Sequence, residues 1–375
     1  MAETETAPRY EALVSLSDAA RRGWLAGVAT RTYALVAGRL VLADHQRPLT
    51  LTPCFDLGDD GEATTLVDDS DLVGPKVATD VVVTGTVRLE TPASRHEVAV
   101  GIGRSQRRAV LLGARRVAVS SRGEVSFDDP STFDTIDLGL ARAFGGYDDY
   151  AHRALAPPKQ GMPLRPGPFA YPRNPMGSGW LIDLDRRRAD GMALPQIEDP
   201  TQPLYPSQLF VSNERAWLDA PAPGNLGWLP HHCYPRLERL TGPLTTHETP
   251  RHRVFETTFE DGDDLPCERM GPRGLQGAAP GLAVERLRGD ELVIMRGLLP
   301  GVDELRFALP RERPKITITM PNLGKRTPEP ILQTVRLDLD RRTVSLTWFG
   351  GLRTAVAIPE AQVVQCALAV RHSKL

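Results

Sequence analysis

Glycine and proline occur so often in this chain that few stretches are long enough to form a helix. The 375 residues include 33 of each, and the combined share of 17.6% exceeds the roughly 12% of average proteins. Most windows beyond ten residues contain one of the two or alternate apolar and polar residues. The sequence therefore predicts a mainly β fold with sandwich-like antiparallel sheets, a long Pro/Gly-rich ordered loop layer and little helix.

The clearest strands are predicted near the C-terminus, where residues 315–320 and 334–340 alternate with period two. A short polar link then leads to residues 344–348, so these last two segments predict an antiparallel hairpin. Residues 359–371 favour either a helix that begins at Pro359 or a final strand over 365–370. Further strands are predicted at 24–35, 39–42, 79–89, 96–102, 110–120 and 305–309.

Proline is concentrated between residues 157 and 235, which hold 15 of the 33 prolines. Regular sheet excludes such a density of proline. The segment also carries large apolar side chains, among them Trp180, Phe210 and Trp228, which flexible linkers lack. We expect an N-terminal β domain over 1–156, an ordered loop layer packed on the sheets over 157–235, and a C-terminal β domain over 236–375.

The charge balance argues against a nucleic-acid partner. Lysine and arginine total 45 against 47 acidic residues, which leaves no excess of positive charge to neutralise phosphates. The most apolar stretches are shorter than the roughly 18 residues of a membrane helix, so no membrane partner is expected. The first residues lack a secretory signal, and the cysteines have no short spacing, so we expect a cytoplasmic protein with free thiols. These cysteines are Cys54, Cys233, Cys267 and Cys366.

Motifs for common enzyme chemistry are missing from the sequence, which contains no dinucleotide or Walker loop, no Gly-x-Ser-x-Gly elbow and no His-Glu-x-x-His pair. One cluster suggests chemistry, because His231, His232, Cys233, His247 and His252 carry the side chains of zinc sites. Their spacing matches no familiar ligand pattern. We expect no catalytic residue, no metal and no cofactor, with a hydrolase or metal-dependent enzyme that uses residues 231–252 as the alternative.

Charged pairs and runs elsewhere are expected to be solvated. The runs lie at 107–108, 115–116 and 186–188 for arginine and at 148–149 for aspartate. Acidic residues elsewhere balance the arginines, and neighbouring aspartates are typical of exposed turns.

Four glycine- and proline-containing motifs follow one another along the chain: GPKVATD at 74–80, ARAFGG at 141–146, NPMGSG at 174–179 and LPQIEDP at 194–200. Together they resemble a bacterial domain-of-unknown-function family whose genes lie beside type VI secretion components, and the resemblance covers nearly the whole chain. It implies a non-enzymatic adaptor or chaperone that helps to load an effector onto the secretion spike. The implied partner is a type VI effector, or a PAAR-like or VgrG spike protein. A structural β protein of a secretion or phage-like assembly is a further alternative.

The last three motifs supply the candidate residues for partner binding or for local structure. Glycine permits a positive φ or a close backbone approach, and Asn-Pro and Asp-Pro favour turns, so the sequence leaves both roles open. Arg142 lies in an apolar stretch and is expected to be partly buried and to pair with Glu198 or Asp199. The candidates are Arg142, Phe144, Gly145, Gly146, Asn174, Pro175, Gly177, Gly179, Glu198 and Asp199.

Overall fold

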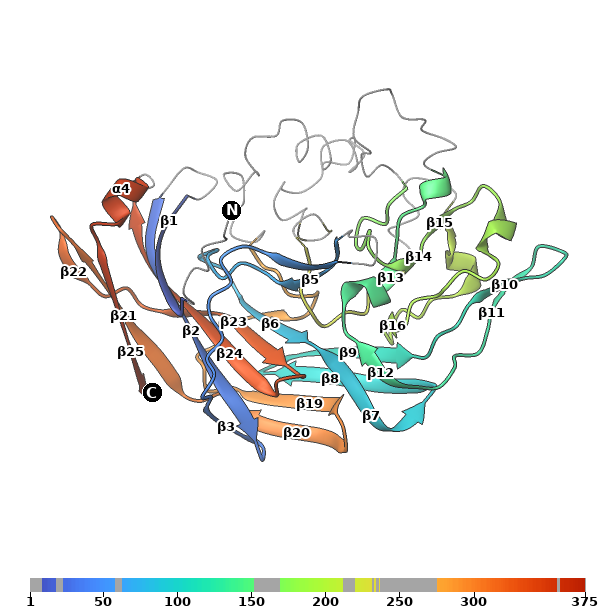
Figure 1. Ribbon diagram of the computed structural model, residues 1–375, viewed down its shortest axis with the longest axis horizontal. Coiled ribbons are helices and arrows are strands. Elements are labelled where there is room, and N and C mark those ends of the chain that lie inside the picture. The colour runs from blue at the N-terminus through green and yellow to red at the C-terminus, as the bar shows by residue number, and fades with distance from the viewer. Residues whose placement is uncertain are drawn as a thin grey trace, which may run out of the picture.

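Strands from both ends of the chain build two large sheets (Figure 1). The computed structural model describes residues 9–17, 23–57, 63–151, 169–211, 220–230, 233, 236, 275–355 and 358–374. None of the helices in these ranges has the length and apolarity to span a lipid bilayer.

The larger sheet has the strand order β1-β2-β24-β23-β6-β18, with β3 paired to β2 beside this path. Its neighbours are antiparallel except for β23 and β6, which run parallel. The predicted hairpin is confirmed, because β23 and β24 pair antiparallel. The strands are β1 Glu11–Ser17, β2 Gly23–Val36, β3 Arg39–Leu42, β6 Thr79–Thr84, β18 Ala283–Val284, β23 Ile331–Asp338 and β24 Thr343–Thr354.

The second sheet has five antiparallel strands in the order β16-β9-β8-β19-β20. They are β8 Arg95–Ile102, β9 Ser105–Leu112, β16 Ile197–Glu198, β19 Leu292–Leu299 and β20 Val302–Ala308.

One apolar core joins the two sheets. Val81 of β6 and Trp348 of β24 belong to the same buried cluster as Val100 of β8 and Met295 of β19. Because alternate side chains of a strand leave opposite faces of its sheet, this shared cluster indicates face-to-face packing. The mainly β, sandwich-like fold with antiparallel sheets is thus confirmed.

A third sheet, in the order β22-β21-β25, covers part of the larger one. Its strands are β21 Glu312–Met320, β22 Gly324–Arg326 and β25 Ala367–Lys374. Ile316 and Ile318 of β21 pack with Leu25 of β2 in a separate apolar cluster. Residues 359–371, for which helix and strand were both open, form the short helix α4 Glu360–Val363 and then enter β25.

Short elements fill the described loops. The two-stranded pairs are β4 Cys54–Leu57 with β5 Ala63–Asp68, β7 Thr86–Ala93 with β12 Phe133–Asp137, β10 Val117–Val119 with β11 Val125–Phe127, β13 Phe144–Gly145 with β14 Ser178–Gly179, and β15 Leu181–Ile182 with β17 Phe210–Val211. The 3₁₀ turns are η1 Leu140–Arg142, η2 Arg186–Ala189 and η3 Pro206–Gln208.

The expected three-part division of the sequence does not match the sheets. β2 pairs with β24 and β8 pairs with β19, so segments 1–156 and 236–375 share both large sheets. Tyr171, Trp180 and Leu209 of the middle segment share a second apolar cluster with Val117 and Phe144 of the first segment. The expected boundaries were drawn from local composition. Strand pairing between residues far apart in the sequence has no local signal, so the boundaries do not follow the sheets.

Candidate functional site

Three of the four motifs meet in one interlocked group of loops. β13 and β14 pair in parallel, with Phe144 opposite Ser178 and Gly145 opposite Gly179. Ala143 forms a parallel bridge with Ile197, which brings in the motif at 194–200. In Figure 1, β13, β14 and β16 lie together beside β9.

Asn174 holds this group together from the inside. Its side chain is fully buried, and Nδ2 donates to the carbonyl oxygens of Leu140 at 2.8 Å and Phe144 at 3.2 Å. Its own carbonyl oxygen accepts the N–H of Gly146 at 2.8 Å. Pro175 follows at the turn that leads to Gly177. Asn174 therefore acts in local structure by satisfying carbonyl groups of the preceding motif.

The glycines allow the backbones to touch. A methyl group on Gly145 would lie 2.0 Å from the carbonyl oxygen of Asn174, and one on Gly177 would lie 2.4 Å from that of Ala143. Gly146 and Gly179 have φ values of 125° and 101°, in the region that favours glycine.

Phe144 is buried among aromatic side chains. Its ring centroid lies 5.1 Å from that of Tyr171 and 6.5 Å from that of Trp180, both in edge-to-face geometry. Only 1% of Phe144 is exposed. These contacts place Phe144 in the core of the loop layer.

The expected burial of Arg142 and its pairing with Glu198 or Asp199 are wrong. Arg142 is exposed at the end of η1, and Nη1 donates to Gln196 Oε1 at 2.8 Å. Glu198 pairs with Arg115, and Asp199 pairs with Arg107 at 3.0 Å. The antiparallel register of β16 and β9 places Glu198 opposite Val110, so the chain continues through Asp199 toward Arg107.

Arg107 joins two loops. Nη1 donates to Asp199 Oδ2 at 3.0 Å, and Nη2 donates to the carbonyl oxygen of Pro223 at 2.9 Å. Gly224 permits the contact between these loops, because a methyl group there would lie 2.4 Å from the carbonyl carbon of Glu198. One arginine near the start of β9 thus fixes both segments, and the expectation of a solvated face at 107 is wrong.

Arg115 and Glu198 form a second largely buried pair. Burial raises the pKa of Glu198, although the neighbouring Arg115 acts in the opposite direction. Arg115 Nη2 also donates to the carbonyl oxygen of Pro195. Arg115 therefore connects the motif at 194–200 to the end of β9, rather than facing solvent as the sequence suggested.

Asp148 was expected in a solvated turn, and this is wrong as well. It is 3% exposed and accepts from Arg188, from the N–H of Ala151 at 2.9 Å and from the N–H of Ile182 at 2.9 Å. Burial alone would raise its pKa, but Arg188 and the two N–H groups outweigh this and hold the pKa below its usual value.

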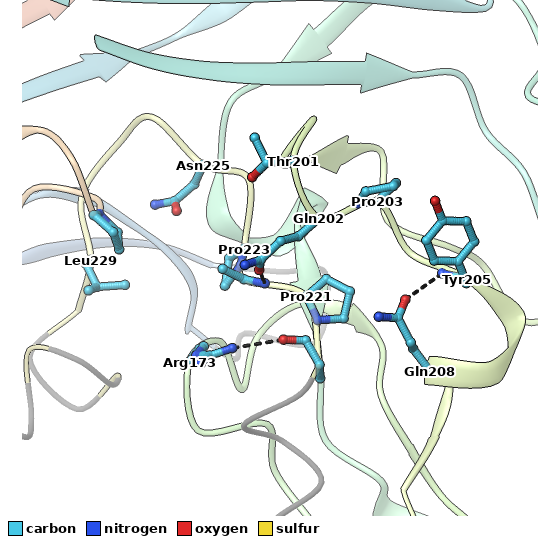
Figure 2. Close-up of a pocket in the computed structure, with 13 residues that line it drawn as sticks. Arg173, Thr201, Gln202, Pro203, Tyr205, Gln208, Pro221, Pro223, Asn225 and Leu229 are labelled. Atoms are coloured by element: carbon cyan, nitrogen blue, oxygen red, sulfur yellow. Dashed lines mark hydrogen bonds between the residues drawn. The ribbon is translucent and has the colours of Figure 1, made fainter. Parts of the chain in front are cut away.

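The loops tied by Arg107 enclose a pocket of about 650 Å³ (Figure 2). This volume lies within the range of ligand sites. The described lining is rich in proline and amide side chains and contains no histidine, cysteine or carboxylate. Its members include Arg173, Gln202, Tyr205, Gln208, Pro223 and Asn225.

Several polar groups of the pocket have partners within the chain. Arg173 donates to the carbonyl oxygen of Ala220 at 2.9 Å and to Tyr171 Oη at 3.1 Å. Gln208 Oε1 accepts the N–H of Tyr205 at 2.8 Å, as Figure 2 shows. Sequence reasoning missed this pocket, because its walls come from separate loops. The proline density between 157 and 235 was the one signal that pointed to the region.

The first motif, at 74–80, carries a buried ion pair at the sheets. Lys76 Nζ lies 2.7 Å from Asp80 Oδ2, and the two side chains are 2% and 0% exposed. Asp80 also accepts from Gln276 Nε2 and from the N–H of Gly277, each at 2.8 Å. Both carboxylate oxygens of Asp80 are thus bonded within the chain, and the pair contributes to the fold.

Most of the histidine and cysteine cluster lies outside the described residues, including His231, His232, His247 and His252. Cys233 is described, is completely buried, and has a thiol whose pKa burial raises. In the described part of the chain, Cys54, Cys233 and Cys366 are free thiols, and no group of three or more His, Cys, Asp or Glu residues is placed to hold a metal. Cys267 lies outside this part.

No curated protein and no solved structure matches this chain. A family model matches residues 20–348, which is most of its length. The chain thus belongs to the family described as uncharacterized proteins conserved in bacteria (DUF2169).

Proposed function

We propose that this protein is a non-enzymatic adaptor or chaperone. It binds a type VI secretion effector, or a PAAR-like or VgrG spike protein, and helps to load the effector onto the spike. The support for the secretion context is the resemblance of the four motifs; the family model shows only that the family is bacterial.

The observation that carries the binding function is the pocket beside the interlocked motifs. Its described walls offer amides, hydroxyls and prolines, which recognise peptides and other proteins, whereas acid–base catalysis needs groups that titrate near neutral pH. Arg107, near the start of β9, holds the wall at Pro223 beside the loop of Asp199. A rigid scaffold that carries recognition loops is a common arrangement in binding proteins.

The alternative of an enzyme that uses residues 231–252 gains no support from Cys233. A thiol acts as nucleophile or metal ligand in its deprotonated form, and burial disfavours that form here. Elemental analysis of the purified protein tests this alternative directly. Stoichiometric zinc would favour the enzyme over the adaptor.

The adaptor proposal is tested by a pull-down with the tagged full-length protein against each protein encoded beside its gene. We expect at least one effector or spike protein to remain bound through gel filtration, because a stable interface buries upwards of about 1,000 Å². Retention of none of them would contradict the proposal. Sedimentation of assembled particles then separates the adaptor from a structural component, because only the latter remains in the particles in stoichiometric amount.

A further inference from the structure

The side-chain oxygen of Asn225 is a buried hydrogen-bond acceptor without a donor. Asn225 is 1% exposed and lines the pocket, and in the described part of the chain its Oδ1 has no hydrogen-bond partner. Its Nδ2 makes only a long contact of 3.5 Å with the carbonyl oxygen of Trp228. Buried acceptors are almost always paired, so this oxygen calls for a donor from a molecule in the pocket.

Two glutamine amides add donors to the same pocket. Gln202 Oε1 accepts the N–H of Ala222 at 3.1 Å, and Gln208 Oε1 accepts the N–H of Tyr205 at 2.8 Å. These bonds set the orientation of each amide and leave its NH₂ group without an acceptor among the described residues. The pocket therefore presents both an unpaired acceptor and unpaired donors.

The remaining walls are apolar or aromatic. Pro203, Pro221 and Pro223 line the pocket, and Tyr205 is 56% exposed. Proline and exposed tyrosine side chains pack well against extended peptides, including polyproline II segments. Arg173 carries the one charge of the described lining, and it already donates to Ala220 and Tyr171.

We propose that this pocket binds a short extended peptide segment of the partner protein. One backbone N–H of the segment donates to Asn225 Oδ1, and its carbonyl oxygens accept from the amides of Gln202 and Gln208. A peptide backbone offers both kinds of group without a net charge, which fits this lining. The inference rests on the proposed adaptor function and names the part of the partner that the adaptor recognises.

The first experiment selects a display library of random 12-residue peptides on the full-length protein and measures the enriched peptides by calorimetry. We expect Asn225→Ala to weaken their binding about tenfold, since a hydrogen bond is lost and the peptide N–H remains unpaired. The matched control is Asn322→Ala, because Asn322 is exposed in the link between β21 and β22 and does not line the pocket. The Asn322→Ala variant should bind the enriched peptides with the same affinity as the wild type. A selection without enriched peptides, or equal affinities for all three proteins, would overturn the proposal.

The second experiment changes the peptide and compares its binding to the wild type and to Asn225→Ala. Each amide of an enriched peptide is replaced in turn by an ester, which removes one N–H donor. At one position the ester should weaken binding to the wild type about tenfold. The same ester should not weaken binding to Asn225→Ala, which already lacks the acceptor. Uniform losses along the peptide would reject the contact with Asn225. If the pull-down succeeds while both peptide experiments fail, the adaptor function stands and its contact lies on another surface.

Discussion

Gly145 has no room for a side chain, because a methyl group there would lie 2.0 Å from the backbone oxygen of Asn174. We expect Gly145→Ala to lower the free energy of unfolding by about 3 kcal/mol or more, since backbone rather than a flexible side chain must move. Gly103→Ala is the control, because Gly103 also has a positive φ, 58°, but nothing lies within 4 Å of the added methyl group. Gly103→Ala should lower the free energy of unfolding by only about 1 kcal/mol. Urea unfolding measures both, and equal losses would show that the close approach is unimportant.

The short β16 is held on β9 by arginines, and two neighbouring arginines of β9 allow a matched test. Arg107 pairs with Asp199 where both side chains are about one-tenth exposed, whereas Arg108 pairs with Glu97 at the surface. We expect a double-mutant cycle of Arg107→Ala and Asp199→Ala to give a coupling energy of about 1–3 kcal/mol. The cycle of Arg108→Ala and Glu97→Ala should give less and should weaken in salt. Equal couplings in the two cycles would refute the role of Arg107 as an anchor.

The whole molecule should fold as one unit, because both large sheets combine strands from the two ends of the chain. β6 lies between β23 and β18, and β8 lies between β9 and β19, so residues 1–156 lack both partners of β6 and one of the two partners of β8. We expect a fragment of 1–156 to show no cooperative unfolding transition, and a fragment of 236–375 to restore one when the two are co-expressed. Circular dichroism during urea unfolding provides the measurement. A stable isolated 1–156 fragment would contradict the shared core.

Much of the strand content was readable from the sequence, because alternation within a strand is a local property. The predictions at 24–35 and 39–42 correspond to β2 and β3, and that at 96–102 corresponds to β8. The predicted strand at 79–89 is divided into β6 and β7 at Gly85. Here a positive φ of 100° breaks the run, and only the backbone conformation shows this.

The partners of the charged motif residues depended on tertiary structure. Glu198 and Asp199 were predicted to pair with Arg142, but in the structure they pair with Arg115 and Arg107, which the pairing of β16 with β9 brings near. Arg142 is closer in the sequence to Glu198 and Asp199 than Arg115 and Arg107 are, but it is exposed at the surface. A register between strands some 85 residues apart is a non-local property, so no local pattern encodes it.

The sequence by itself thus determined the strands, the turns and the glycines that the interlocked motifs need, because these follow from local side-chain alternation and backbone sterics. Tertiary structure alone decided where these motifs meet, which arginines they bind and that Asn225 lies buried at a pocket. The tripeptide Gly224-Asn225-Leu226 is unremarkable as a sequence. It acquires a buried, unpaired acceptor only in the folded chain, because burial arises from packing between distant segments.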